Sequence, residues 1–182
     1  TVDSTSLDFT ENDAFTISAW FKPDTTTGEN TIIRKGRTGG GKLEYILRVN
    51  DGSLEGFYSD GNGNTASVST SFSDTGNWHH VVYRYNGSND QNTLFLDGTQ
   101  VDSTSSSLTL QDNNADLHVG ASFSDESNTG CSSANGASFF SGDVDEVQFY
   151  DKPVSDSSVD NLYEFNDVST PSFVTSFTSS PD

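Results

Sequence analysis

The chain has 182 residues, and its 27 acidic side chains outnumber its 8 basic ones, which gives a formal net charge of −19. This charge disfavours nucleic acid as a partner, because phosphate binding requires a basic surface. The length suits one well-buried domain rather than two. Since the sequence has no run of about 18 apolar residues, we expect no membrane insertion.

The acidic excess predicts adaptation to salt. Asp outnumbers Glu by 20 to 7, and only four residues are Lys. At molar salt the Debye length is only ~3 Å, so the mutual repulsion of surplus carboxylates is screened. We therefore expect a salt-adapted protein, with an ordinary acidic secreted domain as the alternative.

Short segments of alternating apolar and polar residues predict β-strands along most of the chain. The expected strands lie at residues 14–22, 31–36, 43–49, 53–59, 65–72, 78–86, 117–121 and 142–151, with a hairpin at 92–103. The strand at 65–72 is polar and is expected near a sheet edge, whereas the strand at 78–86 is apolar on both faces and is expected at the centre. Residues 154–165 are predicted to form one helix, because Val159, Leu162 and Tyr163 recur at helical spacing.

The strand at 142–151 carries an acidic residue in an unfavourable place. Strict alternation puts Asp145 on the same face as Val147 and Phe149, which we take as the core side. Burying a lone carboxylate is costly, so Asp145 requires a compensating partner. A salt bridge or backbone cap is one interpretation, and a bound metal ion is the other.

Six segments follow one another in a recognisable order: FTISAWFKP (15–23), TIIRKG (31–36), NWHHVVYRYNG (77–87), LFLDGTQV (94–101), LHVG (117–120) and FFSGDVDEVQFYDKPVSDSSVDNLYEF (139–165). Their order resembles that of the laminin-G-like domains of the concanavalin A-like superfamily, here in a salt-adapted form of haloarchaeal or halophilic-virus type. The resemblance implies an all-β jelly-roll sandwich of two antiparallel sheets, one of them concave, with one short C-terminal helix. The domain would span residues 1–166, which leaves 167–182 as a Ser/Thr/Pro-rich tail or linker.

The resemblance also implies a structural calcium ion. In many such domains the Asp of the final strand holds Ca²⁺ on the side away from the concave groove, and Asp145 matches that residue. By analogy, Asp3 and the carbonyl group of Gly36 would supply further ligands. Ca²⁺ takes about 6–8 oxygen ligands, a demand that carboxylate and carbonyl groups meet.

Catalytic patterns are not found in the sequence. Glycosidases of this fold resemble one another in alternating acidic residues along one strand, and retaining chemistry needs two carboxyl groups about 5–5.5 Å apart. No two of the seven Glu share a strand face in the predicted pattern. His79 and His80 are adjacent, so they point to opposite faces and cannot chelate one ion together. We therefore expect no enzyme.

Binding is the remaining function class. Sugar sites combine an aromatic platform with polar side chains at loop ends. The candidate ligand-binding residues are Tyr58, Asp60 and Asn62 at one sheet end, Tyr45 and Arg48 on the concave face, and Asp125, Glu126 and Asn128 in the loop at 122–136. Packing is the alternative for Tyr45, and a salt-adapted surface is the alternative for the loop acids.

We therefore expect a non-catalytic recognition or adhesion module that binds a glycan or glycoprotein through the concave face or its rim loops. Its expected location is extracellular, on a cell surface or a virion surface. The first alternative is a structural or decoration subunit that self-assembles in a surface layer, filament or virion. The second is an accessory domain of a larger secreted enzyme. Binding predicts exposed aromatic residues, whereas assembly predicts a broad apolar patch or a free edge strand.

Overall fold

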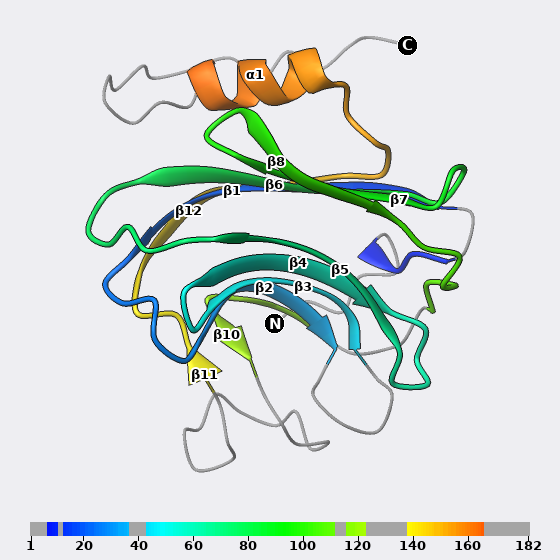
Figure 1. Ribbon diagram of the computed structural model, residues 1–182, viewed down its shortest axis with the longest axis horizontal. Helices are drawn as coiled ribbons and strands as arrows, with labels where there is room; N and C mark the ends of the chain where they lie inside the picture. The colour runs from blue at the N-terminus through cyan, green and yellow to red at the C-terminus, as the bar shows by residue number, and fades with distance from the viewer. Residues whose placement is uncertain (1–6, 11–12, 37–42, 112–115, 123–137, 166–182) are drawn as a thin grey trace, which may run out of the picture.

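The computed structural model describes residues 7–10, 13–36, 43–111, 116–122 and 138–165. This part of the chain contains twelve β-strands and one α-helix (Figure 1). Their bounds are β1 (Ala14–Pro23), β2 (Glu29–Gly36), β3 (Leu43–Asn50), β4 (Ser53–Ser59), β5 (Thr65–Ser71), β6 (His79–Asn86), β7 (Gln91–Leu96), β8 (Thr99–Ser105), β9 (Leu117–Val119), β10 (Ala121–Ser122), β11 (Ser138–Phe139), β12 (Gly142–Tyr150) and α1 (Asp156–Phe165).

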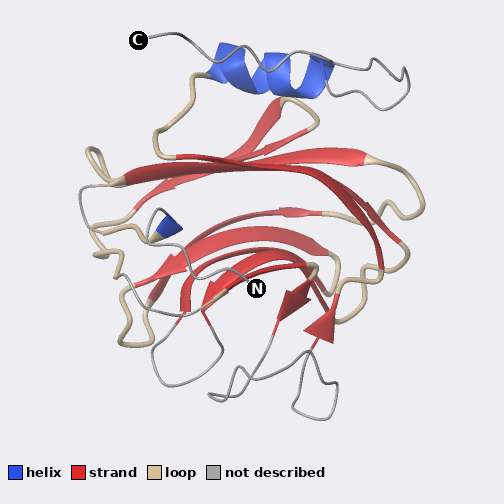
Figure 2. Ribbon diagram, turned by 180° about the vertical axis from the view of Figure 1, so that it is seen from behind, coloured by secondary structure: helices blue, strands red, loops and turns tan. Residues whose placement is uncertain are grey.

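Two sheets of five strands each pack face to face. One, which we call the covered sheet, has the order β12-β1-β6-β7-β8, and helix α1 lies over its outer face (Figure 1). The other, which we call the curved sheet, has the order β5-β4-β3-β2-β9 and bends so that its outer face is concave (Figures 1 and 2). Strands β10 and β11 pair with each other beside β2. The predicted all-β sandwich with one C-terminal helix is confirmed.

Alternation along the strands explains the core between the sheets. Phe15 of β1 lies at its centre and is fully buried. Its ring centroid lies 5.0 Å from that of Tyr45, and 5.6 Å from those of Tyr83 and Tyr85. Gly56 leaves room for this cluster, because a Cβ atom at that position would lie 2.6 Å from Cδ2 of Tyr83. These described aromatic residues of β1, β3 and β6 therefore pack the two sheets together.

The hairpin expected at 92–103 and the expected positions of two strands are confirmed. The β3–β4 turn has positive φ at Asp51 (46°) and Gly52 (82°), and the β7–β8 turn has positive φ at Asp97 (49°) and Gly98 (74°). These are the left-handed conformations that hairpin turns of this kind require. The polar strand β5 lies at a sheet edge, and the apolar strand β6 lies in the middle of the covered sheet.

Strand β12 departs from strict alternation, so the prediction that Asp145 lies on the core side is wrong. Against β1, Trp20 pairs with Asp145 but Ser18 pairs with Gln148, so two residues of β12 lie opposite the single residue Ala19. This is a β-bulge, and Glu146 within it has a φ of 47°. The bulge lets both Val144 and Val147 pack against the core, although they are three residues apart. Asp145 is consequently exposed on the outer face of the covered sheet.

Helix α1 is held on the covered sheet by two of the three apolar residues of its predicted pattern and by polar contacts at its start. Val159 is fully buried against Val82 and Phe95, and the ring of Tyr163 stacks 5.8 Å from that of Trp20. The backbone N–H of Ser158 donates to Oγ of Ser155, which caps the helix. No helix in the described ranges is long and apolar enough to cross a membrane.

Candidate functional site

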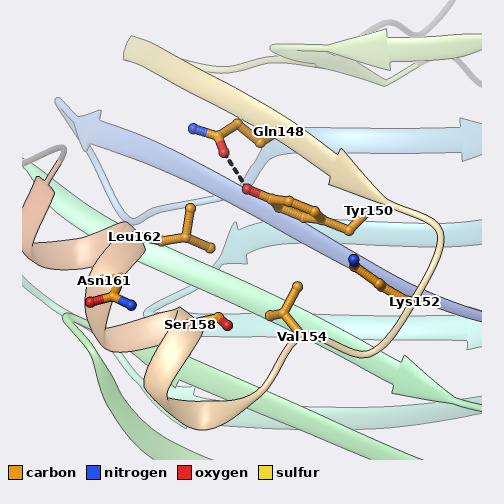
Figure 3. A pocket seen from close by; sticks show the side chains of 7 residues that line it. All are labelled: Gln148, Tyr150, Lys152, Val154, Ser158, Asn161 and Leu162. Atoms are coloured by element: carbon orange, nitrogen blue, oxygen red, sulfur yellow. Dashed lines mark hydrogen bonds between the residues drawn. The ribbon is translucent and has the colours of Figure 1, made fainter. Parts of the chain in front are cut away.

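A pocket of about 470 Å³ opens between strand β12 and helix α1 (Figure 3). Its volume is within the range of small-molecule sites, about 300–1,000 Å³. The lining mixes one aromatic ring, two amides, a hydroxyl and a basic group with two apolar side chains. The lining residues are Gln148, Tyr150, Lys152, Val154, Ser158, Asn161 and Leu162.

Three consecutive pieces of chain build this pocket. Gln148 and Tyr150 come from the end of β12, where the bulge has turned them to the outer face. Lys152 and Val154 come from the connection to the helix. Ser158, Asn161 and Leu162 follow at helical spacing, so α1 presents them on one face. The pocket therefore depends on the bulge at one side and on helix docking at the other.

The helix side of the pocket is fixed by Arg84 of β6. Its Nη1 atom donates to the carbonyl group of Val154 at 2.7 Å and to Oδ1 of Asp156 at 2.7 Å. The hydroxyl of Thr16 donates to the carbonyl group of Lys152 at 2.8 Å and accepts from the N–H of Val154 at 3.1 Å. These contacts hold the connection between strand and helix in one conformation, so the side chain of Lys152 projects from an ordered backbone.

Hydrogen bonding orients the polar groups at the strand side. The hydroxyl of Tyr150 donates to Oε1 of Gln148 at 2.5 Å (Figure 3). Burial raises the pKa of Tyr150, so the hydroxyl stays protonated and remains a donor at neutral pH. The amide nitrogen of Gln148 is then left to donate to a ligand. The ring of Tyr150 packs on the apolar cluster beneath the helix.

The charge of Lys152 sets this residue apart. The part of the chain that the structure describes contains six basic side chains, and five of them form ion pairs with carboxylates. These five are Lys22, Arg34, Lys35, Arg48 and Arg84. Lys152 forms no ion pair with any described residue, and no residue that lines its pocket is acidic. Within the described part of this strongly acidic protein, the pocket therefore holds a positive charge that no carboxylate neutralises.

A second polar cluster lies on the concave face of the curved sheet and contains the predicted residue Arg48. Its guanidinium group donates to Glu29 at 2.7 Å and to Glu55 at 2.9 Å, and it lies 5.0 Å above the ring of Phe57. Neighbouring Arg34 is buried beside Glu29, and burial lowers the pKa of Arg34 to about 10 although Glu29 opposes the shift. Arg48 is thus placed on the predicted face, where its charge is already neutralised.

The predicted aromatic platform of Tyr45 and Tyr58 is wrong. Both side chains are fully buried and point into the core between the sheets. The Tyr45 hydroxyl donates to the carbonyl group of Leu7 at 3.2 Å, and the Tyr58 hydroxyl donates to that of Leu108 at 2.7 Å. Packing, the alternative interpretation for Tyr45, is what the structure shows. The adjacent Phe57 has the opposite orientation, which the alternation of β4 would have indicated.

Asp60 and Asn62 are the other predicted ligand-binding residues that the structure describes, and both lie in the β4–β5 turn. Asp60 organises the β4–β5 turn, where its Oδ1 atom accepts from the N–H groups of Asn62 at 2.8 Å and Asn64 at 3.1 Å. A hydrogen bond from the side chain of Asn64 lowers the pKa of Asp60. These contacts give Asp60 a local structural role in the turn. Asp125, Glu126 and Asn128 lie outside the described residues.

Of the three predicted calcium ligands, the structure describes Asp145 and Gly36, and each has a hydrogen-bond partner within the chain. Oδ1 of Asp145 accepts a hydrogen bond from the N–H of Glu146 at 2.8 Å. This contact is the backbone cap that the sequence analysis gave as the alternative to a metal ion. The carbonyl group of Gly36 accepts from Nε of Arg34 at 3.0 Å, and this cation disfavours a calcium ion at the same oxygen. Asp3 lies outside the described residues, and in the described ranges no three His, Cys, Asp or Glu residues gather as a metal site. The calcium site stays a prediction that rests on Asp145.

We expect Ca²⁺ to raise the melting temperature of the chain and Asp145→Ala to abolish this rise. A ligand that binds only the folded state stabilises it, by about 2.7 kcal/mol at about 100 times its Kd. Calorimetric melts after chelator treatment, with and without added Ca²⁺, would measure the effect. Asp160→Ala is the matched control, because Asp160 is exposed on helix α1. An equal rise in the two variants would exclude Asp145 as a ligand.

None of the seven pocket residues was among the predicted site residues. Two signals in the sequence point toward the pocket. Gln148 and Tyr150 alternate on one face of the final strand, and Lys152 is one of only eight basic residues in the chain. The histidine prediction, in contrast, is confirmed. His79 lies against Phe21 and Phe72 in the core, whereas His80 lies against Trp20 and Tyr163 on the outer face.

Two antiparallel sheets with a concave outer face define a lectin-like β-sandwich domain. The chain belongs to the laminin G 3 family, described as the concanavalin A-like lectin/glucanases superfamily, whose profile matches residues 1–160. No curated protein matches the sequence significantly.

Among solved structures, the chain is similar to binding domains of clostridial toxins. The binding domain of Paraclostridial Mosquitocidal Protein 1 has a TM-score of 0.62 at 19% identity, over 90% of this chain and 40% of that one. The binding domain of botulinum neurotoxin serotype G has a TM-score of 0.62 at 14% identity, over 89% and 39%. The binding domain of botulinum neurotoxin DC, in complex with rat synaptotagmin II, has a TM-score of 0.58 at 14% identity, over 85% and 36%. The chain thus spans about two fifths of each of these structures, and at these identities the likeness establishes the shared fold.

Proposed function

We propose that this chain is a non-catalytic recognition module of a secreted or surface-exposed, salt-adapted protein and that it binds a glycan or the glycan of a glycoprotein. The observation that carries the proposal is the pocket between β12 and α1. It combines the ring of Tyr150 with amide, hydroxyl and ammonium groups around a floor of Val154 and Leu162. Sugars present apolar C–H faces and many hydroxyl groups, so they are matched by a ring with surrounding donors and acceptors.

The comparisons are compatible with this proposal. The superfamily contains lectins by its description, and the similar structures are binding domains by name. One of them is recorded with a protein partner, rat synaptotagmin II. A recognition role for the present chain fits these relatives, while its own ligand has to be identified by experiment.

A binding assay with a pocket-filling variant tests the proposal. The chain would be applied to a glycan array at molar KCl, and hits would be quantified by calorimetry. Asn161→Trp places a large side chain in the pocket at an exposed helix position, and it is expected to weaken binding at least about tenfold. Ser157→Trp is the matched control, because Ser157 is exposed on the same helix but does not line the pocket. Equal binding by both variants, or no glycan bound by the wild-type chain, would contradict the proposal.

Self-assembly is the second candidate, and the open sheet edges favour it. Strands β5 and β8 each end one sheet within the described residues, and an edge strand can pair with another chain through its backbone groups. At Ser69 of β5 such pairing is opposed, because its N–H donates to Oδ2 of Asp102 in β8 at 2.8 Å. Against assembly, β5 alternates small polar side chains on its exposed face, which gives little apolar area to bury. Light scattering at molar salt decides the matter, because a decoration or filament subunit is expected to form oligomers and a monomeric module is not.

The salt adaptation also leads to a specific expectation. We expect the melting temperature to rise from low to molar KCl, because screening relieves the repulsion among 27 acidic residues while it weakens only a few ion pairs. For a chain of this length each kcal/mol gained corresponds to about 2–4 °C. Circular dichroism melts across the salt range measure this, and sucrose at matched water activity is the control for non-ionic stabilisation. A flat profile would contradict the salt adaptation.

A further inference from the structure

We propose that the pocket between β12 and α1 selects an anionic saccharide residue, whose acidic group pairs with the ammonium group of Lys152. This inference rests on the proposed glycan-binding function and names the chemical class of its ligand. The acidic group would be a carboxylate, as in a uronic acid, or a sulfate ester, since both offer oxygen atoms to an ammonium group.

The first argument is the charge balance around Lys152. In a chain of 27 acidic and 8 basic residues, a basic side chain has many carboxylates to pair with. Lys22 pairs with Asp143 at 2.7 Å, and Arg84 pairs with Asp156 at 2.7 Å, although both acids are well exposed. Lys152 has no such partner among the described residues. Its charge is therefore available to a ligand.

The second argument is the absence of local repulsion in the lining. The described pocket residues include no Asp or Glu. Asp156 lies at the start of the helix that forms one wall, but its Oδ1 atom is held by Nη1 of Arg84. An anionic group at Lys152 thus meets an ammonium group and neutral polar side chains, which is a favourable environment for a negative charge.

The third argument concerns the groups beside the charge. Gln148 is oriented by the hydroxyl of Tyr150, so its amide nitrogen can donate to a ligand oxygen. Asn161 is exposed on the helix side of the same pocket, and Figure 3 shows its amide on the opposite wall from Gln148 and Tyr150. Figure 3 shows Lys152 beside Tyr150, on the connection between the strand and the helix. Polar groups on two walls with a cation at the connecting end suit a ring that bears several hydroxyl groups and one acidic group.

The net charge of the chain does not prevent this binding under saline conditions. Long-range repulsion of an anion by a charge of −19 is strong in dilute buffer. At molar salt the Debye length is ~3 Å, so this long-range repulsion is removed, whereas a contact pair between the exposed ammonium group of Lys152 and an acidic group lies within that distance. Binding should accordingly be measured at molar KCl.

The test compares three ligands of matched length and linkage: an oligouronate, its methyl ester, in which the carboxylates are neutralised, and the corresponding oligosaccharide without carboxyl groups that carries sulfate esters instead. Titration calorimetry with the whole chain is expected to show that the ester binds at least about tenfold more weakly than the oligouronate or the sulfated sugar. Lys152→Gln is expected to remove this preference and to leave the affinity for the ester unchanged. Lys22→Gln makes the same change of net charge outside the pocket and should keep the preference. Circular dichroism confirms that both variants fold.

Each outcome separates the two proposals. A preference for the oligouronate identifies a carboxylate as the recognised group, and a preference for the sulfated sugar identifies a sulfate. Equal binding of all three ligands, or a preference that survives Lys152→Gln, would overturn the anionic inference and leave glycan recognition intact. Ester binding that Asn161→Trp does not weaken would place the glycan elsewhere and overturn both at this pocket.

Discussion

Replacing Lys35 by alanine is expected to lower the free energy of unfolding by about 3–5 kcal/mol. Lys35 is fully buried on β2, and its Nζ atom lies 2.6 Å from Oδ1 of Asp8 and 2.9 Å from Oε2 of Glu44. Burial alone would lower the pKa of Lys35, but its hydrogen bonds with Asp8 and Glu44 raise it. Removal of this cation leaves Glu44 buried beside a second carboxylate, and desolvated charges without compensation are strongly destabilising.

The same cluster ties the start of the chain to the curved sheet. Oε1 of Glu44 accepts the N–H of Phe9 at 2.9 Å, and Phe9 packs against Phe15 in the core. Loss of Lys35 therefore weakens this attachment as well. Hydrogen exchange of the amide of Phe9 is expected to accelerate in the variant.

Urea denaturation at constant molar salt measures the loss, and two further variants control for its cause. Lys22→Ala removes a cation that is 30% exposed and paired with Asp143, so it should cost no more than about 1 kcal/mol. The double variant Lys35→Met with Glu44→Gln keeps the acceptor for Phe9 and removes both charges, so it should recover part of the loss. Equal losses for Lys22→Ala and Lys35→Ala would show that burial of the cluster does not determine its energy.

His80 is expected to make the protein progressively less stable as the pH falls from 6.5 toward 4. Its side chain is almost completely buried under helix α1, and its Nε2 atom lies 2.8 Å from Oγ of Ser18. Burial lowers its pKa from the ordinary 6.5 to about 4, although Asp97 opposes the shift. Below pH 6.5 the unfolded chain therefore takes up a proton that the folded chain refuses. The resulting loss of stability reaches about 3 kcal/mol near pH 4.

The measurement is the free energy of unfolding of wild type and His80→Gln between pH 7 and 4. The difference between the two proteins should change by about 3 kcal/mol across this window in favour of the variant, whatever its value at pH 7. His79 has the opposite sign, because its hydrogen bond with Asp97 raises its pKa and its contribution is lost as the pH rises. Both proteins retain His79, so its effect cancels. A pH-independent difference would show that His80 does not titrate in this way.

Much of the fold could be predicted from the sequence, because alternation and turn residues act locally. The strands, the edge position of β5, the central position of β6 and the helix register of Val159 and Tyr163 all follow from patterns within a few residues. The predicted face of Asp145 was wrong because the bulge breaks the alternation at Glu146. Glu146 has a positive φ, which is uncommon for glutamate, so the sequence gives no sign of the bulge. A prediction from strict alternation assumes no extra residue in the strand, so it assigns the wrong face to residues on one side of a bulge.

The site was harder to predict because its features are not local. Tyr45 and Tyr58 were candidates for a surface, yet distant backbone carbonyl groups satisfy their hydroxyls inside the core. The pocket exists only where α1 docks beside β12. Lys152 differs from the other described basic residues because it forms no ion pair with a described carboxylate. Which basic residues pair with carboxylates depends on the three-dimensional structure, so the sequence does not give this difference.

Because of the bulge in β12, the packing of the interior and the lining of the pocket both depend on the number of residues between Val144 and Val147. Val144, Val147 and Phe149 contact the core, while Gln148 and Tyr150 line the pocket from the same strand. A shift by one residue exchanges the two faces of a strand. An insertion or deletion between Val144 and Val147 would therefore send pocket residues into the interior and apolar residues to the ligand. Substitutions at Gln148 or Lys152 leave the interior untouched, so ligand preference can diverge by exchange of side chains but not by change of length.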